Sequence, residues 1–326
     1  MNTKLKAMVV FILVIFIVMS LTCSCARSPF GRTEPKKPQI PESISRGAGN
    51  EPQLVVYVKE NERTENMNIE DYIVGVVAGE MKNDWPIEAL AAQAILARTY
   101  VLEFISSKGG SKYGNAHIST DIEEAQAWDI ASANDRIRQA VAMTRGKVAS
   151  YNGTFIKAWF HAHSGGITAT AKEGLAFKEA EPVYIKKVKS PDANAGPVED
   201  RAWSAVFSND EVRTLIRERF GDDVGPITNL EVVEKGPSGR AAIIRVNNKD
   251  FPGADLRIAL GSSKMRSTLL SDLRIEGENI VIKGRGYGHG VGMSQWGANV
   301  MAGQGTSHED IVKFYFKDLD IVKLWD

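Results

Sequence analysis

Glu80 is the residue whose type and position first suggest chemistry in this sequence. It closes an apolar segment, 71–81, that is rich in valine and isoleucine. A carboxyl group partly removed from water at such a position has a raised pKa and can hold a proton near neutrality, as a general acid must. An ordinary surface or capping glutamate would give the same local sequence. The rest of the chain has to decide between these two interpretations.

The segments around this glutamate predict two consecutive helices. Asp71 is a candidate N-cap for the first helix, whose isoleucines and valines predict burial. Pro86 suits the first turn of the second helix, which is rich in alanine, and Gly109 followed by Gly110 should end it. Glu80 is therefore expected at the break between two buried helices.

A second chemical pattern lies near the C-terminus, at 284–298. Glycine occupies every second position from Gly284 to Gly292. In extended backbone this spacing puts the glycines on one face and four side chains on the other, namely Arg285, Tyr287, His289 and Val291. A bare backbone face would let a long polymer lie directly against it, although a tightly packed corner without a ligand would explain the glycines nearly as well. The G-x-G-x-x-G spacing of phosphate-binding loops does not occur in this stretch.

Two histidines and a turn form a third candidate region. His161 and His163 would share one face of a strand, but a metal would need further ligands, and the other histidines have no suggestive spacing. We therefore expect no metal and interpret the pair as packing against, or hydrogen-bonding, a substrate. Ser164 and Gly165 begin a tight turn where the backbone can approach a ligand closely. Further on, Ser294 is predicted to cap a helix that begins at Gln295.

Composition limits the classes of protein to consider. The 326 residues are 43% hydrophobic and carry a formal net charge of zero, which predicts one large or two moderate globular domains and no nucleic-acid partner. Both cysteines, Cys23 and Cys25, lie near the N-terminus. The body of the protein therefore has neither disulfides nor thiolate metal ligands.

The N-terminal segment 1–26 predicts either a membrane anchor or a lipoprotein signal. Lys4 and Lys6 precede an uncharged apolar run of about 20 residues, just long enough to span a bilayer. Acylation of Cys25 is the alternative, but Ser20 or Thr22 stands where such cleavage sites favour an aliphatic residue, so we favour the anchor. Either interpretation places the rest of the chain outside the cytoplasm.

The remaining sequence predicts an α+β fold on a spacer. Residues 27–52 are rich in proline and are expected to separate the domain, 53–326, from the membrane. Within the domain, 53–59 reads as the first strand, and strands at 147–149 and 155–161 flank a hairpin turn at Asn152 and Gly153. Residues 191–270, with a helix at 210–220 and strands at 227–234 and 241–247, are expected to form a smaller inserted lobe.

Four blocks of this sequence resemble the SpoIID/LytB family and occur in its order. They are Tyr72-Ile-Val-Gly-Val-Val-Ala-Gly-Glu-Met81, Glu88-Ala-Leu-Ala-Ala-Gln-Ala-Ile-Leu-Ala-Arg-Thr-Tyr100, His161-Ala-His-Ser-Gly-Gly166 and Gly286-Tyr-Gly-His-Gly-Val-Gly-Met-Ser-Gln-Trp-Gly-Ala298. The resemblance covers the chain from about residue 54 to its C-terminus.

The resemblance implies a peptidoglycan lytic transglycosylase of sporulation or cell-wall remodelling. Such an enzyme cleaves the β-1,4 bond between N-acetylmuramic acid and N-acetylglucosamine and leaves a 1,6-anhydro end. The family's catalytic glutamate falls on Glu80. Its arginine in the following helix falls on Arg98, which would orient Glu80 or the sugar, unless it forms a structural ion pair. The groove that binds the glycan strand would be lined by Ser164, Gly165, Tyr287, His289 and Gln295.

One block departs from the family. Some SpoIID proteins carry a zinc site in a block that here reads Ser119-Thr-Asp-Ile-Glu-Glu-Ala-Gln-Ala127. Ser119, Glu124 and Ala125 stand where two cysteines and a histidine would be, so we predict neither a structural zinc nor any other cofactor.

The same blocks also allow a function of another class. LytB-like members are described as amidase enhancers, which implies a non-catalytic module that binds peptidoglycan and recruits or stimulates an amidase or endopeptidase. Such a module would use the same groove but would need no proton donor. An apolar setting for Glu80 favours the enzyme, whereas the altered block at 119–127 favours the module.

Overall fold

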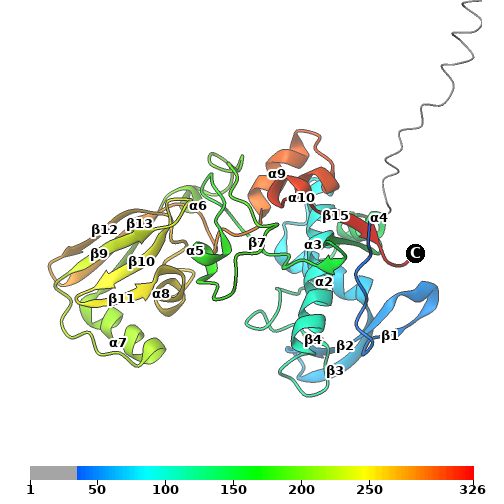
Figure 1. Cartoon of the computed structure of the whole chain (residues 1–326), viewed down its shortest axis with the longest axis horizontal. Helices are drawn as coiled ribbons and strands as arrows, with labels where there is room; N and C mark the ends of the chain where they lie inside the picture. Colours follow the sequence, from blue (N-terminus) through cyan, green and yellow to red (C-terminus); the bar gives the residue numbers. More distant parts are fainter. Residues whose placement is uncertain (1–34) are drawn as a thin grey trace, which may run out of the picture. The chain divides into compact units, whose positions relative to one another are not determined.

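The computed structural model describes residues 35–326 (Figure 1), so the anchor or lipoprotein signal predicted at 1–26 lies outside the described residues. The described part of the predicted spacer packs on the domain. Ile40 and Ile44 are buried in the main core, and β1 (Ser45–Arg46) pairs antiparallel with β2 (Pro52–Val58). The isoleucines among the prolines supply apolar surface whose burial holds this segment to the domain.

Two helices form the centre of the main core. α2 (Ile69–Glu80) packs against α3 (Ile87–Lys108), which is buried along most of its length. α3 is the one helix of residues 35–326 that is long and apolar enough to cross a membrane, and its burial identifies it as a core helix. Around the pair lie β3 (Arg63–Asn68), β4 (Ile118–Ser119) and α4 (Asp135–Met143); β2 pairs antiparallel with β3 and parallel with β4.

The ends of these two helices follow from their sequence, with one correction. α2 begins at Ile69 after Asn68, so Asp71 lies inside the first turn, where its charge favours the helix dipole, and is not the predicted N-cap. Pro86 immediately precedes α3 as expected. Gly109 ends α3 in the left-handed conformation, with a φ of 80°.

A small sheet joins distant parts of the chain. β5 (Lys147–Tyr151) lies between β6 (Thr154–Phe155) and β15 (Asp320–Lys323), and the predicted hairpin turn is present, with positive φ at Asn152 and Gly153. The strand predicted at 155–161 is interrupted, because only Phe160 and His161 pair again, as β7. Their parallel partner is β14 (Met293–Ser294), which leads into α9 (Gln295–Gly303) and then α10 (His308–Tyr315).

A second hydrophobic cluster, between Trp203 and Ile282, forms the inserted lobe. One of its sheets has the order β12 (Leu270–Glu276), β13 (Asn279–Gly284), β8 (Trp203–Ser208), and the other has the order β11 (Lys249–Pro252), β10 (Ala241–Val246), β9 (Leu230–Lys235). The helices of this lobe are α7 (Asn209–Phe220) and α8 (Gly253–Ala259), whereas α5 (Ala171–Leu175), which packs on the main core, and α6 (Val198–Arg201) precede it in the chain. Since β8 pairs with β13, the lobe continues past the end predicted at residue 270.

Candidate functional site

A cavity of about 650 Å³ brings together residues that are far apart in the chain. Its wall includes the end of α2, the segment 122–127, β7, the glycine-rich segment, the first residue of α9 and Arg257 of α8. Four of the predicted site residues line it, namely Glu80, Tyr287, His289 and Gln295.

Glu80 lies in this cavity without a positively charged partner among residues 35–326. Its carboxylate accepts hydrogen bonds from the Ala127 N–H (2.7 Å) and from Nε2 of Gln295 (3.3 Å). Burial raises the pKa of Glu80, and these two hydrogen bonds lower it by less. The carboxyl group can therefore hold a proton at a pH at which an exposed glutamate has lost it.

Two glycines in α2 allow the segment around Ala127 to come this close. A Cβ atom on Gly79 would lie 2.8 Å from the backbone nitrogen of Trp128, and one on Gly75 would lie 2.1 Å from Nε1 of the same residue. That indole nitrogen donates to the backbone oxygen of Tyr72 (3.2 Å). Gly75 and Gly79 lie one helical turn apart, so together they form the surface on which residues 127–128 rest. In the sequence, these two glycines stand out only as members of the family block at 72–81.

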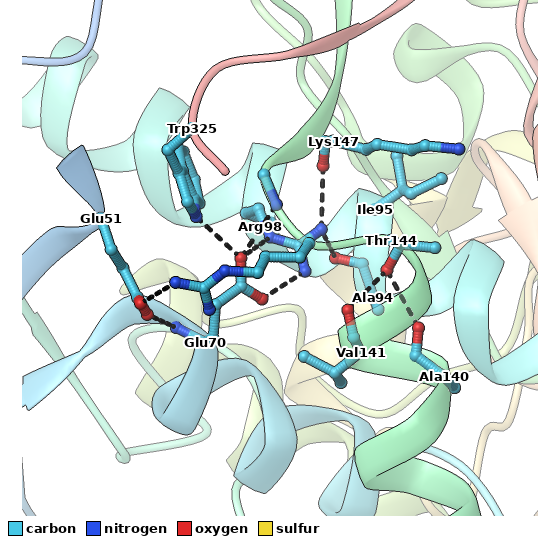
Figure 2. A network of polar contacts seen from close by, with 12 residues as sticks. Glu51, Glu70, Ala94, Ile95, Arg98, Ala140, Val141, Thr144, Lys147 and Trp325 are labelled. Carbon is cyan, nitrogen blue, oxygen red and sulfur yellow. Dashed lines mark hydrogen bonds and ion pairs between the residues drawn. The ribbon is translucent and has the colours of Figure 1, made fainter. Parts of the chain in front are cut away.

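Arg98 lies away from the cavity, and the expectation that it contacts Glu80 or a sugar is wrong. Its guanidinium is completely buried and donates to both carboxylate oxygens of Glu70, from Nε at 3.1 Å and from Nη2 at 2.6 Å. Nη1 donates to the backbone oxygens of Ala94 and Lys147 (Figure 2). All three guanidinium nitrogens therefore have partners, and Arg98 forms the structural ion pair that was the alternative.

The Ser164 turn is also a structural element. The Ser164 hydroxyl is buried and donates to Asp192 (2.6 Å), and the same carboxylate accepts from the Ser164 N–H and from the hydroxyl of Ser294. Burial opposes ionisation of Asp192, but the hydrogen bonds from both serines outweigh it and lower its pKa. Ser164 and Gly165 therefore do not line the cavity, and their turn fixes the start of α9, which carries Gln295.

The glycine-rich segment does not form the predicted strand with one bare face. Four of its glycines have positive φ, between 72° and 106°, and regular pairing ends with β13 at Gly284. The space that their missing side chains leave is filled by the chain itself: a Cβ on Gly288 would lie 2.8 Å from Cβ of His161, and one on Gly292 would lie 2.0 Å from the Trp159 oxygen. No polymer can lie on that face. The glycines instead let Tyr287 and His289 approach β7 at the cavity.

The two cavity histidines are neutral. Burial, and then the charge of Arg240, lowers the pKa of His161 to about 3. Burial, and then the neighbouring His161, lowers the pKa of His289 well below its ordinary value. Near neutral pH neither imidazole therefore holds the second proton that would make it an acid. Glu80 is therefore the acidic group in the cavity suited to donate one.

Several cavity residues escape the sequence prediction. Gln126 and Tyr100 line the cavity from the main core, Arg257 lines it from the inserted lobe, and Trp159 lies beside β7. Only Trp159 had a local signal, since it stands next to the His161 block. The inserted lobe thus contributes a cation, Arg257, to the cavity wall.

The residues at 119–127 do not fit the zinc site that some relatives carry. Ser119 and Glu124 stand at two of its ligand positions and hydrogen-bond each other directly. The Glu124 carboxylate also accepts from the Ser111 hydroxyl and from the Lys112 N–H, each at 2.6 Å. Within residues 35–326 no group of three or more histidine, cysteine or acidic residues is placed to hold a metal ion.

Comparison with known proteins identifies the family of this chain. A family model described as Stage II sporulation protein, SpoIID, matches residues 57–151, which include Glu80 and the segment that holds it. The stage II sporulation protein D of Bacillus amyloliquefaciens is 35% identical over 280 residues, covering 82% of this chain and 77% of that protein. The chain belongs to the SpoIID/LytB family.

Two further matches complete the comparison. The stage II sporulation protein D of Bacillus subtilis is 31% identical over 82% of this chain and 78% of that relative. The amidase enhancer of Bacillus subtilis is 27% identical over 74% of this chain, but the match spans only 39% of that longer protein. Residues 185–292 match a domain of unknown function (DUF8618), a range that includes the inserted lobe.

Proposed function

We propose that this member of the SpoIID/LytB family is a peptidoglycan lytic transglycosylase that acts in sporulation or in cell-wall remodelling. The observation that carries the proposal is Glu80, a partly buried carboxyl group with a raised pKa that has no cationic partner among the described residues and lines a sugar-sized cavity. The N-terminal segment of the protein, 1–26, would hold the domain on the outer face of the membrane.

The proposed reaction uses one carboxyl group twice. Protonated Glu80 donates its proton to the glycosidic oxygen while the bond from that oxygen to C1 of N-acetylmuramic acid breaks. The resulting carboxylate then takes the proton of the C6 hydroxyl as that oxygen bonds to C1. The 1,6-anhydro product forms, Glu80 regains its proton, and no water is consumed. A second carboxylate, which hydrolytic glycosidases use, is therefore not required.

Two contacts suit Glu80 to both halves of this cycle. The Ala127 N–H and the Gln295 amide remain hydrogen-bonded to the carboxylate after it loses its proton, so the charged form keeps hydrogen-bond donors in the cavity. Burial still favours return of the proton. Gln295 thus positions the acid, while Tyr287 and His289 form the wall against which a sugar would bind.

The test is release of anhydro-muropeptides from denuded glycan strands, read by mass spectrometry. We expect the wild type to release them. Glu80→Gln should reduce the rate of release by about a thousandfold or more, since the proton donor is lost. Glu123→Gln is the matched control, because Glu123 lies three residues from Gln126 of the wall but is exposed and does not line the cavity. Full activity of Glu80→Gln would remove Glu80 from the mechanism.

The alternative function is a non-catalytic module that binds peptidoglycan and recruits or stimulates an amidase or endopeptidase. The relative named amidase enhancer favours it. In that case glycan strands would bind and stay intact in the wild type, and Glu80→Gln would stimulate a partner amidase as well as the wild type does. Anhydro ends in the wild-type digest decide for the enzyme.

A further inference from the structure

Two buried polar side chains in the cavity wall have atoms without a hydrogen-bond partner among residues 35–326. Gln126 is 3% exposed, and neither its amide nitrogen nor its amide oxygen has a partner. His161 is 4% exposed, and its Nε2 has none. Both residues line the cavity that holds Glu80, and neither has a role in the reaction described above.

The hydrogen-bonding character of these two groups follows from their surroundings. Nδ1 of His161 lies 3.1 Å from the backbone oxygen of Val291, which can only accept, so Nδ1 carries the hydrogen and Nε2 is an acceptor. The lowered pKa of His161 keeps that lone pair free at neutral pH. Gln126 offers an amide N–H as a donor. The wall thus presents an unused acceptor on His161 and, on Gln126, an amide with both its donor and its acceptor unused.

Unpaired buried polar atoms are uncommon in folded proteins, because each lowers stability relative to a paired one. A core position would be more stable with an apolar residue. Beside a cavity, a bound ligand can supply the missing partners, so both groups point to a ligand with a donor and an acceptor close together.

Apolar side chains adjoin the two polar groups in the same wall. Ile122 is 68% exposed, more than any other large apolar side chain among the described residues. It lines the cavity together with Trp159 and Phe160. Exposed apolar surface at a cavity mouth indicates a ligand with an apolar part.

We propose that Gln126 and His161 recognise the 2-acetamido group of an N-acetylated sugar. The amide N–H of the sugar donates to Nε2 of His161, its carbonyl oxygen accepts from the Gln126 amide, and its methyl group packs against Ile122 and Trp159. This inference rests on the proposed function, since it assumes that the cavity binds a glycan strand.

An acetamido group fits better than a sugar hydroxyl. A trans amide presents its donor and its acceptor in opposite directions, which suits two partners on separate wall segments, and it carries the methyl group that the apolar surface requires. A hydroxyl has no apolar part. A deacetylated sugar would carry an ammonium group into a wall that already contains the Arg257 cation.

The test compares two neutral β-1,4 tetrasaccharides that differ only at C2, chitotetraose with acetamido groups and cellotetraose with hydroxyls. Binding to the purified full-length protein is measured by isothermal titration calorimetry. Two hydrogen bonds and a buried methyl group predict a preference for chitotetraose of roughly a hundredfold.

Three variants make the test specific. Gln126→Leu and His161→Asn should each reduce the preference about tenfold, because each removes one hydrogen bond. His161→Asn keeps a nitrogen near the position of Nδ1 and deletes Nε2, so it tests the acceptor even if Gln126→Leu folds poorly. Gln93→Leu is the matched control: Gln93 is fully buried in α3 with both amide atoms unpaired, but it does not line the cavity.

The outcomes separate this inference from the function on which it rests. A wild type that binds both tetrasaccharides equally overturns acetamido recognition and leaves glycan binding in place. A wild type that binds neither overturns the proposed glycan function and this inference with it. Loss of the preference in Gln93→Leu as large as in Gln126→Leu would also contradict the assignment, since the effect would then not come from the cavity.

Discussion

Each end of α2 carries a glutamate, Glu70 buried and Glu80 half-buried, and the two carboxylates have opposite surroundings. Glu70, in the first turn, accepts from Arg98, from the Gly146 N–H (3.0 Å) and from the Trp325 indole (3.0 Å), as Figure 2 shows for Arg98 and Trp325. Glu80, the last residue, accepts from one backbone N–H and one amide. In the part of the chain that the structure describes, only Glu70 has a cationic partner.

This difference separates a structural carboxylate from a functional one. Four donors, two of them on the Arg98 guanidinium, hold the Glu70 side chain so that it joins α2, α3 and the C-terminal residues. Glu80 faces a cavity, and its burial favours the protonated form. Burial alone therefore does not make a glutamate a candidate for the acid; burial without a compensating charge, beside a cavity, does.

The largest effect is expected at the Glu70 end. Glu70→Gln leaves the Arg98 guanidinium buried without its counter-charge, which should lower the free energy of unfolding by about 3–5 kcal/mol. Urea denaturation followed by circular dichroism measures this. Asp250→Asn is the control, since it removes one partner of an exposed ion pair with Arg245 and should change stability little. A loss no greater than that of the control would show that the network is not structural.

A smaller effect is expected where α2 meets the segment that holds Glu80. Gly79→Ala forces a methyl group against the backbone of Ala127 and Trp128, which should cost about 1–3 kcal/mol of stability and weaken glycan cleavage by moving the Ala127 N–H away from the carboxylate.

The matched control for that change is Gly303→Ala in α9. A Cβ at Gly303 meets nothing within 4 Å, so this helical alanine should be neutral or stabilise by up to about 1 kcal/mol. Denaturation and the glycan-cleavage assay on both variants check the pair. Unchanged cleavage in Gly79→Ala would mean that the Ala127 contact does not position the acid.

The smallest effect has the opposite sign. Because the folded-state pKa of Glu80 is raised, its contribution to stability is present below the unfolded-state pKa and is lost as pH rises through the folded value. Glu80→Gln has no such loss, so it should be more stable than the wild type near neutrality, by about 1 kcal/mol, and equal to it at acidic pH. Urea denaturation at several pH values measures the difference. A variant less stable than the wild type at neutral pH would contradict the raised pKa.

The local fold could be predicted from sequence wherever one segment determines its own structure. The ends of α3, the Asn152–Gly153 turn and the Ser294 cap each depend on neighbouring residues. The spacer and the glycine-rich segment were misjudged because their structure depends on distant partners. Ile40 and Ile44 bind to the core, and the glycines take positive φ to pack against β7.

The site was predicted in part for the same reason. Glu80 could be singled out because it closes an apolar helix, but nothing local distinguishes its environment from that of Arg98, which pairs with a glutamate 28 residues earlier. Gln126 lies in the block at 119–127, but nothing in the sequence marks it as a residue of the cavity wall. Its significance comes from an unsatisfied amide beside a cavity, which only the assembled chain reveals.

Titration of the Glu80 carboxyl group tests the central claim most directly. Carbon-13 NMR of side-chain-labelled glutamate, with the Glu80 resonance assigned by its loss in Glu80→Gln, gives the pKa. We predict a pKa above that of an exposed glutamate, because the carboxyl group is partly removed from water. A pKa at or below the ordinary value would contradict the account, since Glu80 could not then serve as the acid.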